Sequence, residues 1–373
     1  MSSSSSNAKP EFQNGENVSG FEIVKKLGSG GFGAVYHVRK DGVDLALKTE
    51  FIDGDADETL KNEVHMLRLM QWSPCFCRLI TAKKLKWGEA RVNIMVMTLC
   101  SRPLSRLRRM MPDRHFTKST AARLSVYLLD AIRDLHASGL IHRDVKASNC
   151  GWHAPSRRLL LFDLGFSRKY LELDESKTKL RHRTARKSKG FLGTSKYCSL
   201  YVHEEQDQGR RDDLWAWLYS AVEFFLGSLP WANEEKTLVL SNMKRKAGKG
   251  LFCKCPREMA LIHEHIRQLK FDSRPDYEMM LGLFRQMYTR HDIEDSDPMD
   301  FEEGSPFFEE YFNKLSDSEK EMETRTTELV VTSDSDEEEE EEPESEKRMG
   351  RLATGFNRAL RSLINVKNEL FDA

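Results

Sequence analysis

The sequence His142-Arg143-Asp144-Val145-Lys146-Ala147-Ser148-Asn149, followed fourteen residues later by Asp163-Leu164-Gly165, decides the fold of this chain. The spacing places one carboxylate, one amide oxygen and a second carboxylate where phosphoryl transfer from ATP needs a base and two magnesium ligands. We expect Asp144 to orient the substrate hydroxyl and accept its proton, and Asn149 and Asp163 to bind Mg²⁺. A lone Asp more often belongs to a solvated loop, so the prediction depends on the ordered set.

Upstream, Gly28-Ser29-Gly30-Gly31-Phe32-Gly33 has the G-x-G-x-x-G spacing that dinucleotide-binding domains also use. In such a domain a helix follows the glycines, whereas β-branched and aromatic residues follow here, Ala34-Val35-Tyr36-His37-Val38. These residues predict a strand, so we place the glycines in a hairpin that covers the phosphates. Because glycine lacks a Cβ, the hairpin backbone can approach the nucleotide closely.

Lys48 ends the apolar segment Leu45-Ala46-Leu47, and Glu63 lies in a helical pattern of apolar residues. We expect Lys48 to bind the α- and β-phosphates and Glu63 to hold its ammonium in an ion pair. Two unrelated surface charges are the alternative. The apolar surroundings of both residues favour the ion pair.

Two kinds of periodicity divide the chain into lobes. Residues 20–99 alternate short strand patterns with one helix and end at the buried strand pattern 93–97, which predicts a small, mostly β N-lobe. Residues 100–287 predict a larger, mostly α C-lobe, in which an apolar helix ends before Gly139 and the segment 213–227 is apolar on nearly every side. The predicted fold class is therefore α+β and bilobal. Asp213 is expected to bind the catalytic-loop backbone or to act as an acid near a helix N-terminus.

The stretch from about Gly20 to Met287 resembles the casein kinase 1 superfamily of protein kinases, and within it the tau-tubulin kinase type, including divergent nematode members. The residues that carry the resemblance are Gly193-Thr194-Ser195-Lys196-Tyr197-Cys198-Ser199, His203, Arg210-Arg211-Asp212-Asp213-Leu214, and Glu223-Phe224 with Gly227-Ser228-Leu229-Pro230-Trp231. The resemblance implies a bilobal protein kinase fold, ATP and Mg²⁺ in the cleft between the lobes, and phosphorylation of Ser or Thr in protein substrates.

The resemblance also implies roles for individual residues. Lys146 would face the γ-phosphate, Met97 would be the gatekeeper, and the hinge would run from Thr98 to Cys100. The implied catalytic residues are Asp144, Lys146, Asn149, Asp163 and Thr194, of which Asn149 and Asp163 bind the metal. The implied nucleotide contacts are Leu27, Gly28, Gly30, Gly33, Val35, Lys48, Glu63, Met97 and Leu99.

Three departures from the family pattern stand out. Leu164 replaces the usual Phe of Asp-Phe-Gly, and Ala147 replaces a common Pro. Leu keeps an apolar anchor, so we expect Asp163 to remain positioned. Ser199-Leu200-Tyr201 replaces Ser-Ile-Asn in the segment that shapes the substrate site, so substrate preference transfers less well than chemistry.

The segment before Gly193 is rich in cations: Lys177, Lys179, Arg181, Arg183, Arg186, Lys187 and Lys189. Beside a phosphoacceptor site these cations favour acidic or already phosphorylated protein substrates, because arginine binds phosphate and carboxylate in bidentate fashion. Lys196 matches the position of an anion-binding basic residue in the superfamily. A solvated loop is the alternative. Nucleic acid is not expected as a partner, because no aromatic residues interleave with the charges.

After Met287 the composition becomes acidic, and residues 288–346 are expected to form a disordered acidic linker. Two roles are open for this tail beside plain solubilisation: an intramolecular contact with the basic segment as a pseudosubstrate, or phosphorylation at Ser333 and Ser335. Residues 347–373 have the pattern of a basic amphipathic helix that could bind a partner, the kinase domain or an anionic membrane. The segment 1–19 is expected to be disordered.

The composition of the 373-residue chain fits a folded intracellular protein, with 39% hydrophobic residues, 31% charged residues and a net charge of −1. The N-terminal segment has no apolar signal region, and no apolar run approaches about 18 residues, so no transmembrane segment is expected. The seven cysteines of the chain form no C-x-x-C pairs and are expected to be reduced thiols. The expected location is cytoplasmic, with the nucleus also open.

The sequence therefore predicts an ATP-dependent serine/threonine protein kinase. The alternative is a pseudokinase scaffold that binds partners through the fold and the tail, since a fold does not dictate activity. A kinase-like small-molecule phosphotransferase is disfavoured, because Gly193-Thr194 and the long basic segment suit an extended peptide.

Overall fold

The computed structural model describes residues 11–29, 33–52, 59–88, 90–174, 176, 178–187 and 190–312. All of them belong to one compact unit of the chain, which spans Met1–Thr327. Residues 1–10 of the predicted disordered N-terminal segment lie outside this description, as do the tail beyond Phe312 and the predicted C-terminal amphipathic helix. The prediction is wrong for residues 11–19, because Phe12 and Val18 are buried in an apolar core and Asn17–Val18 pairs with the strand that follows.

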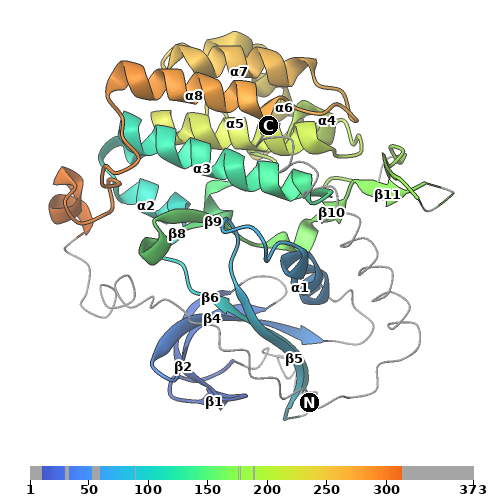
Figure 1. Cartoon of the computed structure of the whole chain (residues 1–373), viewed down its shortest axis with the longest axis vertical. Coiled ribbons are helices and arrows are strands. Elements are labelled where there is room, and N and C mark those ends of the chain that lie inside the picture. Colours follow the sequence, from blue (N-terminus) through green and yellow to red (C-terminus); the bar gives the residue numbers. More distant parts are fainter. Residues whose placement is uncertain are drawn as a thin grey trace, which may run out of the picture. The chain divides into compact units, whose positions relative to one another are not determined.

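The N-lobe is built on one antiparallel sheet of six strands in the order β1-β2-β3-β4-β6-β5 (Figure 1). Apolar residues of the sheet form a core of their own, which includes Ile23, Val38 and Leu47. One face of the sheet is thus free to cover a ligand. The strands are β1 Asn17–Val18, β2 Phe21–Ser29, β3 Ala34–Lys40, β4 Val43–Ile52, β5 Leu79–Trp87 and β6 Ala90–Thr98.

A single helix, α1 (Thr59–Leu69), lies between the sheet and the C-lobe (Figure 1). Its buried face consists of Leu60, Glu63, Met66 and Leu67, so the one charged side chain on this face points inward. A strand follows the glycines and a helix carries Glu63, so the two elements predicted from the local pattern of apolar residues are confirmed. The mostly β N-lobe is confirmed as well.

Helices form the C-lobe and pack around α3 and α5. As predicted, α3 ends just before Gly139, whose φ is 76°, and α5 ends at Gly227, whose φ is 80°. Glycine tolerates this left-handed conformation better than other residues. The helices are α2 Leu104–Met110, α3 Lys118–Ala137, α4 Leu200–His203, α5 Arg210–Leu226, α6 Thr237–Ala247, α7 Arg257–Gln268 and α8 Tyr277–His291.

Short strand pairs hold the loops that join the helices. Strands β8 (Cys150–His153) and β9 (Arg158–Leu161) pair directly after the catalytic loop, and β7 (Leu140–Ile141) pairs with β10 (Arg168–Lys169). The basic segment begins with the hairpin β11 (Leu171–Leu173) and β12 (Leu180–His182). These pairs fix the ends of the two loops that carry Asp144 and Asp163. Six short 3₁₀ or π turns complete the described elements: Pro112–Arg114, Ala147–Asn149, Ala154–Ser156, Leu164–Phe166, Gly248–Phe252 and Phe308–Phe312.

The predicted boundary of the folded domain at Met287 is wrong. Helix α8 continues to His291, and Ile293, Met299, Phe301 and Phe312 are buried in the main core. Residues 288–312 are therefore not a disordered linker, although they are acidic. Their spaced apolar side chains fill the space beside α3, a packing that net composition does not reveal.

Among the residues that the structure describes, no helix combines the length and the apolar character that crossing a bilayer requires.

Candidate functional site

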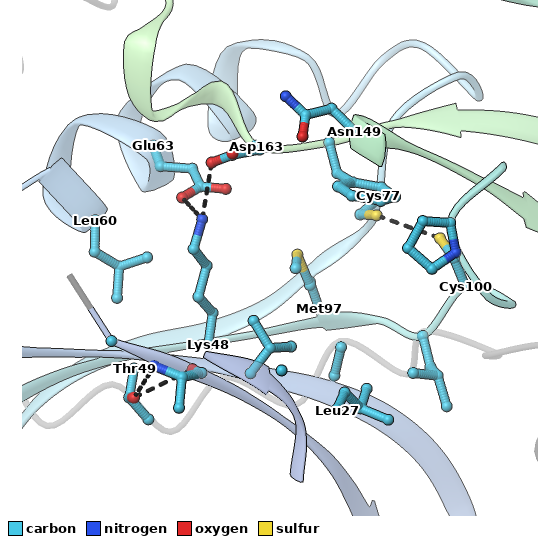
Figure 2. Close-up of a pocket in the computed structure, with 18 of the residues that line it drawn as sticks. Leu27, Lys48, Thr49, Leu60, Glu63, Cys77, Met97, Cys100, Asn149 and Asp163 are labelled. Carbon is cyan, nitrogen blue, oxygen red and sulfur yellow. Dashed lines mark hydrogen bonds and ion pairs between the residues drawn. The ribbon is translucent and has the colours of Figure 1, made fainter. Parts of the chain in front are cut away.

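A cavity of about 450 Å³ lies where the sheet of the N-lobe faces β8 and the loop after β9 (Figure 2). Its lining contains most of the residues that the resemblance assigned to the nucleotide and the metal: Leu27, Gly28, Gly33, Val35, Lys48, Glu63, Met97, Leu99, Asn149 and Asp163. Gly30 lies outside the described residues. The volume suits a ligand of nucleotide size.

The predicted ion pair of Lys48 is present. Its Nζ lies 2.6 Å from Glu63 Oε2 and 3.0 Å from Asp163 Oδ1, so three segments converge on one ammonium (Figure 2). Burial by itself lowers the pKa of Lys48, but the two carboxylates outweigh burial and raise the pKa above its ordinary value. The ammonium is therefore charged and fixed toward the cavity.

Asp163 has a left-handed backbone with φ of 64°, which is uncommon for a residue other than glycine. The following Leu164 is buried, with 1% of its surface exposed, and Asn62 of α1 donates a 2.8 Å hydrogen bond to Gly165 O. Leu in place of Phe thus keeps the apolar anchor, as expected. Burial favours a raised pKa for Asp163, but the charge of Lys48 outweighs it and lowers the pKa.

The catalytic loop brings Asp144, Lys146 and Thr194 into contact. The Thr194 hydroxyl donates to Asp144 Oδ1 at 2.7 Å, and Lys146 Nζ donates to Asp144 Oδ2 at 2.7 Å and to Thr194 Oγ1 at 2.9 Å. Asn149 Nδ2 donates to Asp144 O at 2.9 Å. Four of the five residues predicted to be catalytic thus form one hydrogen-bonded group, and the fifth, Asp163, lines the nucleotide cavity together with Asn149. Their individual roles stay predictions.

Asp213 lies in the first turn of α5 and also accepts hydrogen bonds from the loop backbone, so the structure is consistent with both roles predicted for it. His142 N donates to Asp213 Oδ2 at 2.7 Å, and Arg143 N donates to Oδ1 at 2.8 Å. The buried ring of His136 bridges Asp213 Oδ2, at 2.9 Å, and the Tyr277 hydroxyl. Burial alone would raise the pKa of Asp213, but His136 and the donated hydrogen bonds lower it. A buried carboxylate of α5 therefore stiffens the loop that carries Asp144.

Gly33 is required by a contact that the motif did not predict. A Cβ at this position would overlap the carbonyl oxygen of Thr49, whereas a Cβ at Gly28 would meet nothing within 4 Å. The amide of Ala34 donates to Thr49 Oγ1 at 3.1 Å and holds the two strands together. Glycine at position 33 thus permits close packing of β3 on β4, in addition to any approach to phosphate.

The residues present fit a nucleotide and a divalent cation. Lys48 supplies a fixed ammonium, and the side chain of Asp163 remains 42% exposed. Because Asn149 uses its nitrogen on Asp144, its oxygen is left for a cation. Among the described residues no cluster of three or more His, Cys, Asp or Glu could hold a metal. The two predicted ligands would therefore share a cation with phosphate oxygens and water, as is usual for Mg²⁺.

Lys196 does not offer a free charge for anions. Its Nζ lies 2.5 Å from Glu223 Oε1, and Tyr197 donates to Glu223 Oε2 at 2.7 Å. Arg108 Nη2 reaches the same carboxylate at 3.0 Å. The segment after Thr194 is thereby tied to α5. The family position of Lys196 suggested an anion site, but its partner lies 27 residues away in sequence and only the fold brings it near.

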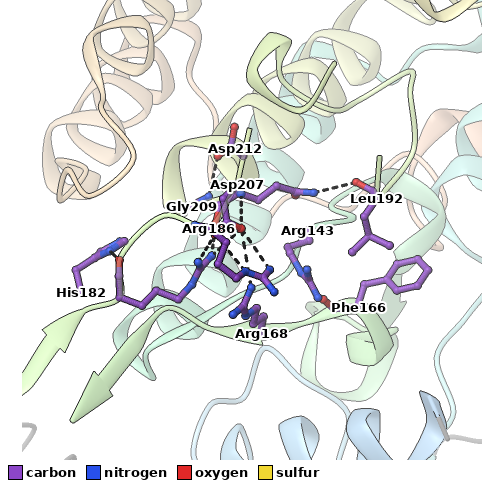
Figure 3. A network of polar contacts seen from close by, with 11 residues as sticks. Arg143, Phe166, Arg168, His182, Arg186, Leu192, Asp207, Gly209 and Asp212 are labelled. Atoms are coloured by element: carbon purple, nitrogen blue, oxygen red, sulfur yellow. Dashed lines mark hydrogen bonds and ion pairs between the residues drawn. The ribbon is translucent and has the colours of Figure 1, made fainter. Parts of the chain in front are cut away.

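Three arginines pair with the carboxylate of Asp207 instead, and Arg143 lies near them (Figure 3). Arg183 binds Asp207 through both of its terminal nitrogens, and Arg186 donates to it from the backbone at 2.9 Å. Arg168 lies 3.9 Å from the same carboxylate. Burial, with Arg186 and Arg183 nearby, lowers the pKa of Arg143 to about 10. We call Arg143, Arg168, Arg183, Arg186 and Asp207 the arginine cluster.

Of the other predicted cations, Lys179, Arg181 and Lys187 are exposed, while Lys177 and Lys189 lie outside the described residues.

Several lining residues were missed by sequence reasoning. Cys77, Cys100 and Phe162 line the nucleotide cavity, and the two sulfur atoms lie 3.8 Å apart. Cys100 belongs to the predicted hinge, so its place could have been inferred. Cys77 carries no local signal, because it reaches the cavity from the turn between α1 and β5.

Comparison with known proteins gives consistent matches. The profile of the protein kinase domain matches residues 21–284. A probable serine/threonine-protein kinase of Dictyostelium discoideum is 33% identical over 75% of this chain and 56% of its own length. Two proteins of Caenorhabditis elegans are similar as well: a putative serine/threonine-protein kinase at 33% identity, covering 76% of this chain and 82% of that protein, and the serine/threonine-protein kinase spe-6 at 30%, covering 76% and 75%.

Proposed function

We propose that this chain transfers the γ-phosphoryl group of Mg²⁺-ATP to Ser and Thr side chains of proteins, because it belongs to the protein kinase family and its relatives are serine/threonine kinases. The observation that carries the proposal is the contact of Asp144 with both Lys146 and Thr194, beside an intact Lys48–Glu63 pair. In protein kinases the Lys–Glu ion pair must be in place for phosphoryl transfer, and the catalytic-loop aspartate accepts the proton of the substrate hydroxyl.

Each residue of this group has a defined task in the proposed reaction. Asp144 accepts the proton of the substrate hydroxyl. The oxygen of that hydroxyl bonds to the γ-phosphorus, while the bond between the γ-phosphorus and the bridging oxygen of the β-phosphate breaks. Lys146 is positioned by Asp144 and Thr194 to neutralise charge on the transferring group. Bound Mg²⁺ would supply further charge neutralisation at Asn149 and Asp163. Lys48 binds and orients the remaining phosphates.

The test separates a kinase from a pseudokinase scaffold. The full chain would be incubated with Mg²⁺, labelled ATP and Ser- or Thr-containing peptides, beside the Asp144→Asn and Asp163→Asn variants. We expect label on the peptides with the wild-type chain and a loss of about 100-fold or more in both variants. Nucleotide binding without label above the variants would favour the scaffold.

We propose further that the substrates are acidic or already phosphorylated. The arginine cluster supports this proposal, because three guanidinium groups pair with one carboxylate and leave excess positive charge. Arg168 and Arg186 keep 28% and 34% of their side chains exposed, so an anion can reach them. Arginine binds phosphate in bidentate fashion, which lysine does not.

Matched peptides test the preference. The KM of a phosphorylated peptide would be compared with that of its unphosphorylated form, in the wild-type chain and in Arg186→Gln. We expect a lower KM for the phosphorylated peptide and a rise of about 10-fold in the variant, since one charged hydrogen bond contributes about 1.5–3 kcal/mol. Arg106→Gln, an exposed change on α2, is the control. Equal KM values for both peptides would contradict the preference and leave the kinase proposal intact.

A further inference from the structure

A second cavity, of about 270 Å³, lies in the C-lobe and shares no lining residue with the nucleotide cavity. We call it the α5–α7 cavity, because Trp215 and Tyr219 of α5 and His263 of α7 form its walls. Leu200 and Tyr201 of α4 close one side, directly after the segment that carries Thr194. The cavity is therefore next to the substrate segment but separate from the chemistry.

Five aromatic rings contribute to the wall: Tyr201, Trp215, Tyr219, Phe252 and His263. Trp215 lies 5.4 Å from the ring of His263 and 5.5 Å from that of Tyr219, and Phe252 lies 4.9 Å from His263. Such a wall offers a large apolar contact area to a side chain of a partner, and aromatic residues dominate the energetics of binding interfaces.

Two nitrogen atoms in this wall are buried and lack a hydrogen-bond partner among the described residues: Trp215 Nε1 and His263 Nδ1. His263 is only 5% exposed. Both nitrogen atoms are closed off from solvent, so they offer no hydrogen bond to a partner in the cavity. Binding in this cavity therefore depends on apolar contact with the rings.

The chain around the cavity is strongly basic. Between Met243 and Glu258 the sequence holds six cations and no acidic residue: Lys244, Arg245, Lys246, Lys249, Lys254 and Arg257. Glu204 pairs with Arg245 at 3.0 Å, and Glu264 pairs with Lys249 at 3.8 Å, which offsets part of this charge. Lys249 remains 76% exposed at its side chain, and Lys254 is exposed as well. The rim thus attracts a negatively charged partner.

The cavity is also connected to the substrate segment. Lys244 donates 2.6 Å hydrogen bonds to Ser195 O and Cys198 O, and its Nζ lies 5.1 Å from the ring centre of Tyr219. One side chain thereby joins the wall of the cavity to the loop that follows Thr194. A partner held here lies on the same lobe as the phosphoacceptor site.

We propose that the α5–α7 cavity is a docking site for a short acidic peptide segment of a partner protein, with one large apolar side chain in the cavity. The basic rim complements the acidic flanks. The volume lies just below the range of about 300–1,000 Å³ typical of whole small-molecule sites, which suits one or two side chains. Docking does not depend on phosphoryl transfer, so it stands or falls separately from the proposed kinase activity.

The test measures fluorescence anisotropy of labelled ten-residue peptides with a central Trp, Phe or Leu among Asp and Glu residues, mixed with the full chain. We expect a Kd of roughly 10 μM at low salt, weakening as salt screens the charges. Replacing the central residue with Ala is expected to weaken binding at least about 10-fold. Trp215→Phe removes part of the aromatic wall and is expected to weaken binding about 2- to 10-fold.

A matched pair of charge reversals serves as control. Lys249→Glu with Lys254→Glu is expected to weaken binding at least about 10-fold, whereas Lys83→Glu with Lys86→Glu, on exposed positions of β5, leaves it unchanged. Thermal unfolding of all variants checks that they fold. The proposal is overturned if no acidic peptide binds at 100 times the expected Kd, if both reversals weaken binding equally, or if only phosphatidylserine vesicles bind.

Discussion

The hydroxyl of Thr194 occupies a central place among the reacting groups. It donates to Asp144 Oδ1 and accepts from Lys146, so it fixes the relative orientation of the base and the cation. A displacement of about 1 Å in such a group can cost about 100-fold in rate. Thr194 therefore acts on the reaction through its neighbours and is a positioning residue.

Removing this hydroxyl should slow phosphoryl transfer. We expect Thr194→Val to lower kcat about 10- to 100-fold with little change in the KM for ATP, because the nucleotide cavity does not include Thr194. Thr194→Ser should restore most of kcat, since it returns the hydroxyl. Steady-state kinetics of the three chains provides the measurement, and a Ser variant as slow as the Val variant would contradict this role.

His203 should make the stability of the substrate segment depend on pH. Burial, with Lys244 nearby, lowers the pKa of His203 to about 4, and the ring accepts a 3.1 Å hydrogen bond from Lys244 Nζ. In the unfolded chain the imidazole of His203 takes up a proton near pH 6.5. Between pH 6.5 and 4 the unfolded chain therefore binds more protons at His203 than the folded chain does. The free energy of unfolding therefore falls as the pH falls through this window.

Urea unfolding at pH 7 and pH 5 measures this dependence. The full shift of the His203 pKa corresponds to about 3 kcal/mol of unfolding free energy. Because the ring is partly exposed, we expect the free energy of unfolding to fall by only about 1 kcal/mol between pH 7 and pH 5. His203→Gln keeps an acceptor for Lys244 and should lose about 1 kcal/mol less than the wild-type chain. Identical losses in both chains would show that another group titrates.

At the scale of elements, the start of α3 depends on a residue far along the chain. Asp300 accepts hydrogen bonds from Thr117 N and Thr117 Oγ1, both at 2.7 Å, while Thr117 caps the helix by accepting from Thr120 N. Arg123 of the same helix donates to Pro298 O at 3.0 Å. The segment after α8 thus fixes the helix that leads into the catalytic loop.

Removing this carboxylate should destabilise the C-lobe. We expect Asp300→Ala to lower the free energy of unfolding by about 1–2 kcal/mol, because it leaves buried donors at the helix N-terminus without a partner. Thermal or chemical unfolding would measure the change. Glu303→Ala is the control, because Glu303 is exposed and equally acidic. A loss no larger than in the control would contradict the capping role.

At the scale of the whole molecule, the folded part of the chain extends through Phe312. Ile293, Met299, Phe301 and Phe312 belong to the same core as α3 and α5. Trp152 of β8 donates a 2.8 Å hydrogen bond to Glu302, which links this segment to the strand beside the hinge. The segment after α8 is therefore part of the domain.

Shortened chains provide the test. Burying one large apolar side chain contributes about 1.5–3 kcal/mol, and total stability is only about 5–15 kcal/mol. We expect the chain of residues 11–312 to fold and the chain of residues 11–287 to be insoluble or to melt far lower, as measured by soluble yield and Tm. Equal Tm values for the two chains would support Met287 as the end of the folded domain.

Sequence alone was sufficient for the features that depend on local spacing. The ordered set of Asp144, Asn149 and Asp163 predicted the chemistry, and the strand after Gly33 excluded a dinucleotide-binding turn. The periodicity of α3 and α5 predicted a helical C-lobe. The strand and helix inferences succeeded because each depends on side chains a few residues apart, whose relation follows from the geometry of one strand or helix.

Only the tertiary structure decided which distant groups meet. It placed the Thr49 carbonyl against Gly33, paired Lys196 with Glu223, gathered three arginines around Asp207 and packed Phe312 into the core. None of these contacts has a local signature, because each joins segments whose separation in space depends on the packing of the whole domain. The sequence by itself thus determined the kind of chemistry, and the packing determined which charges remain available to bind a partner.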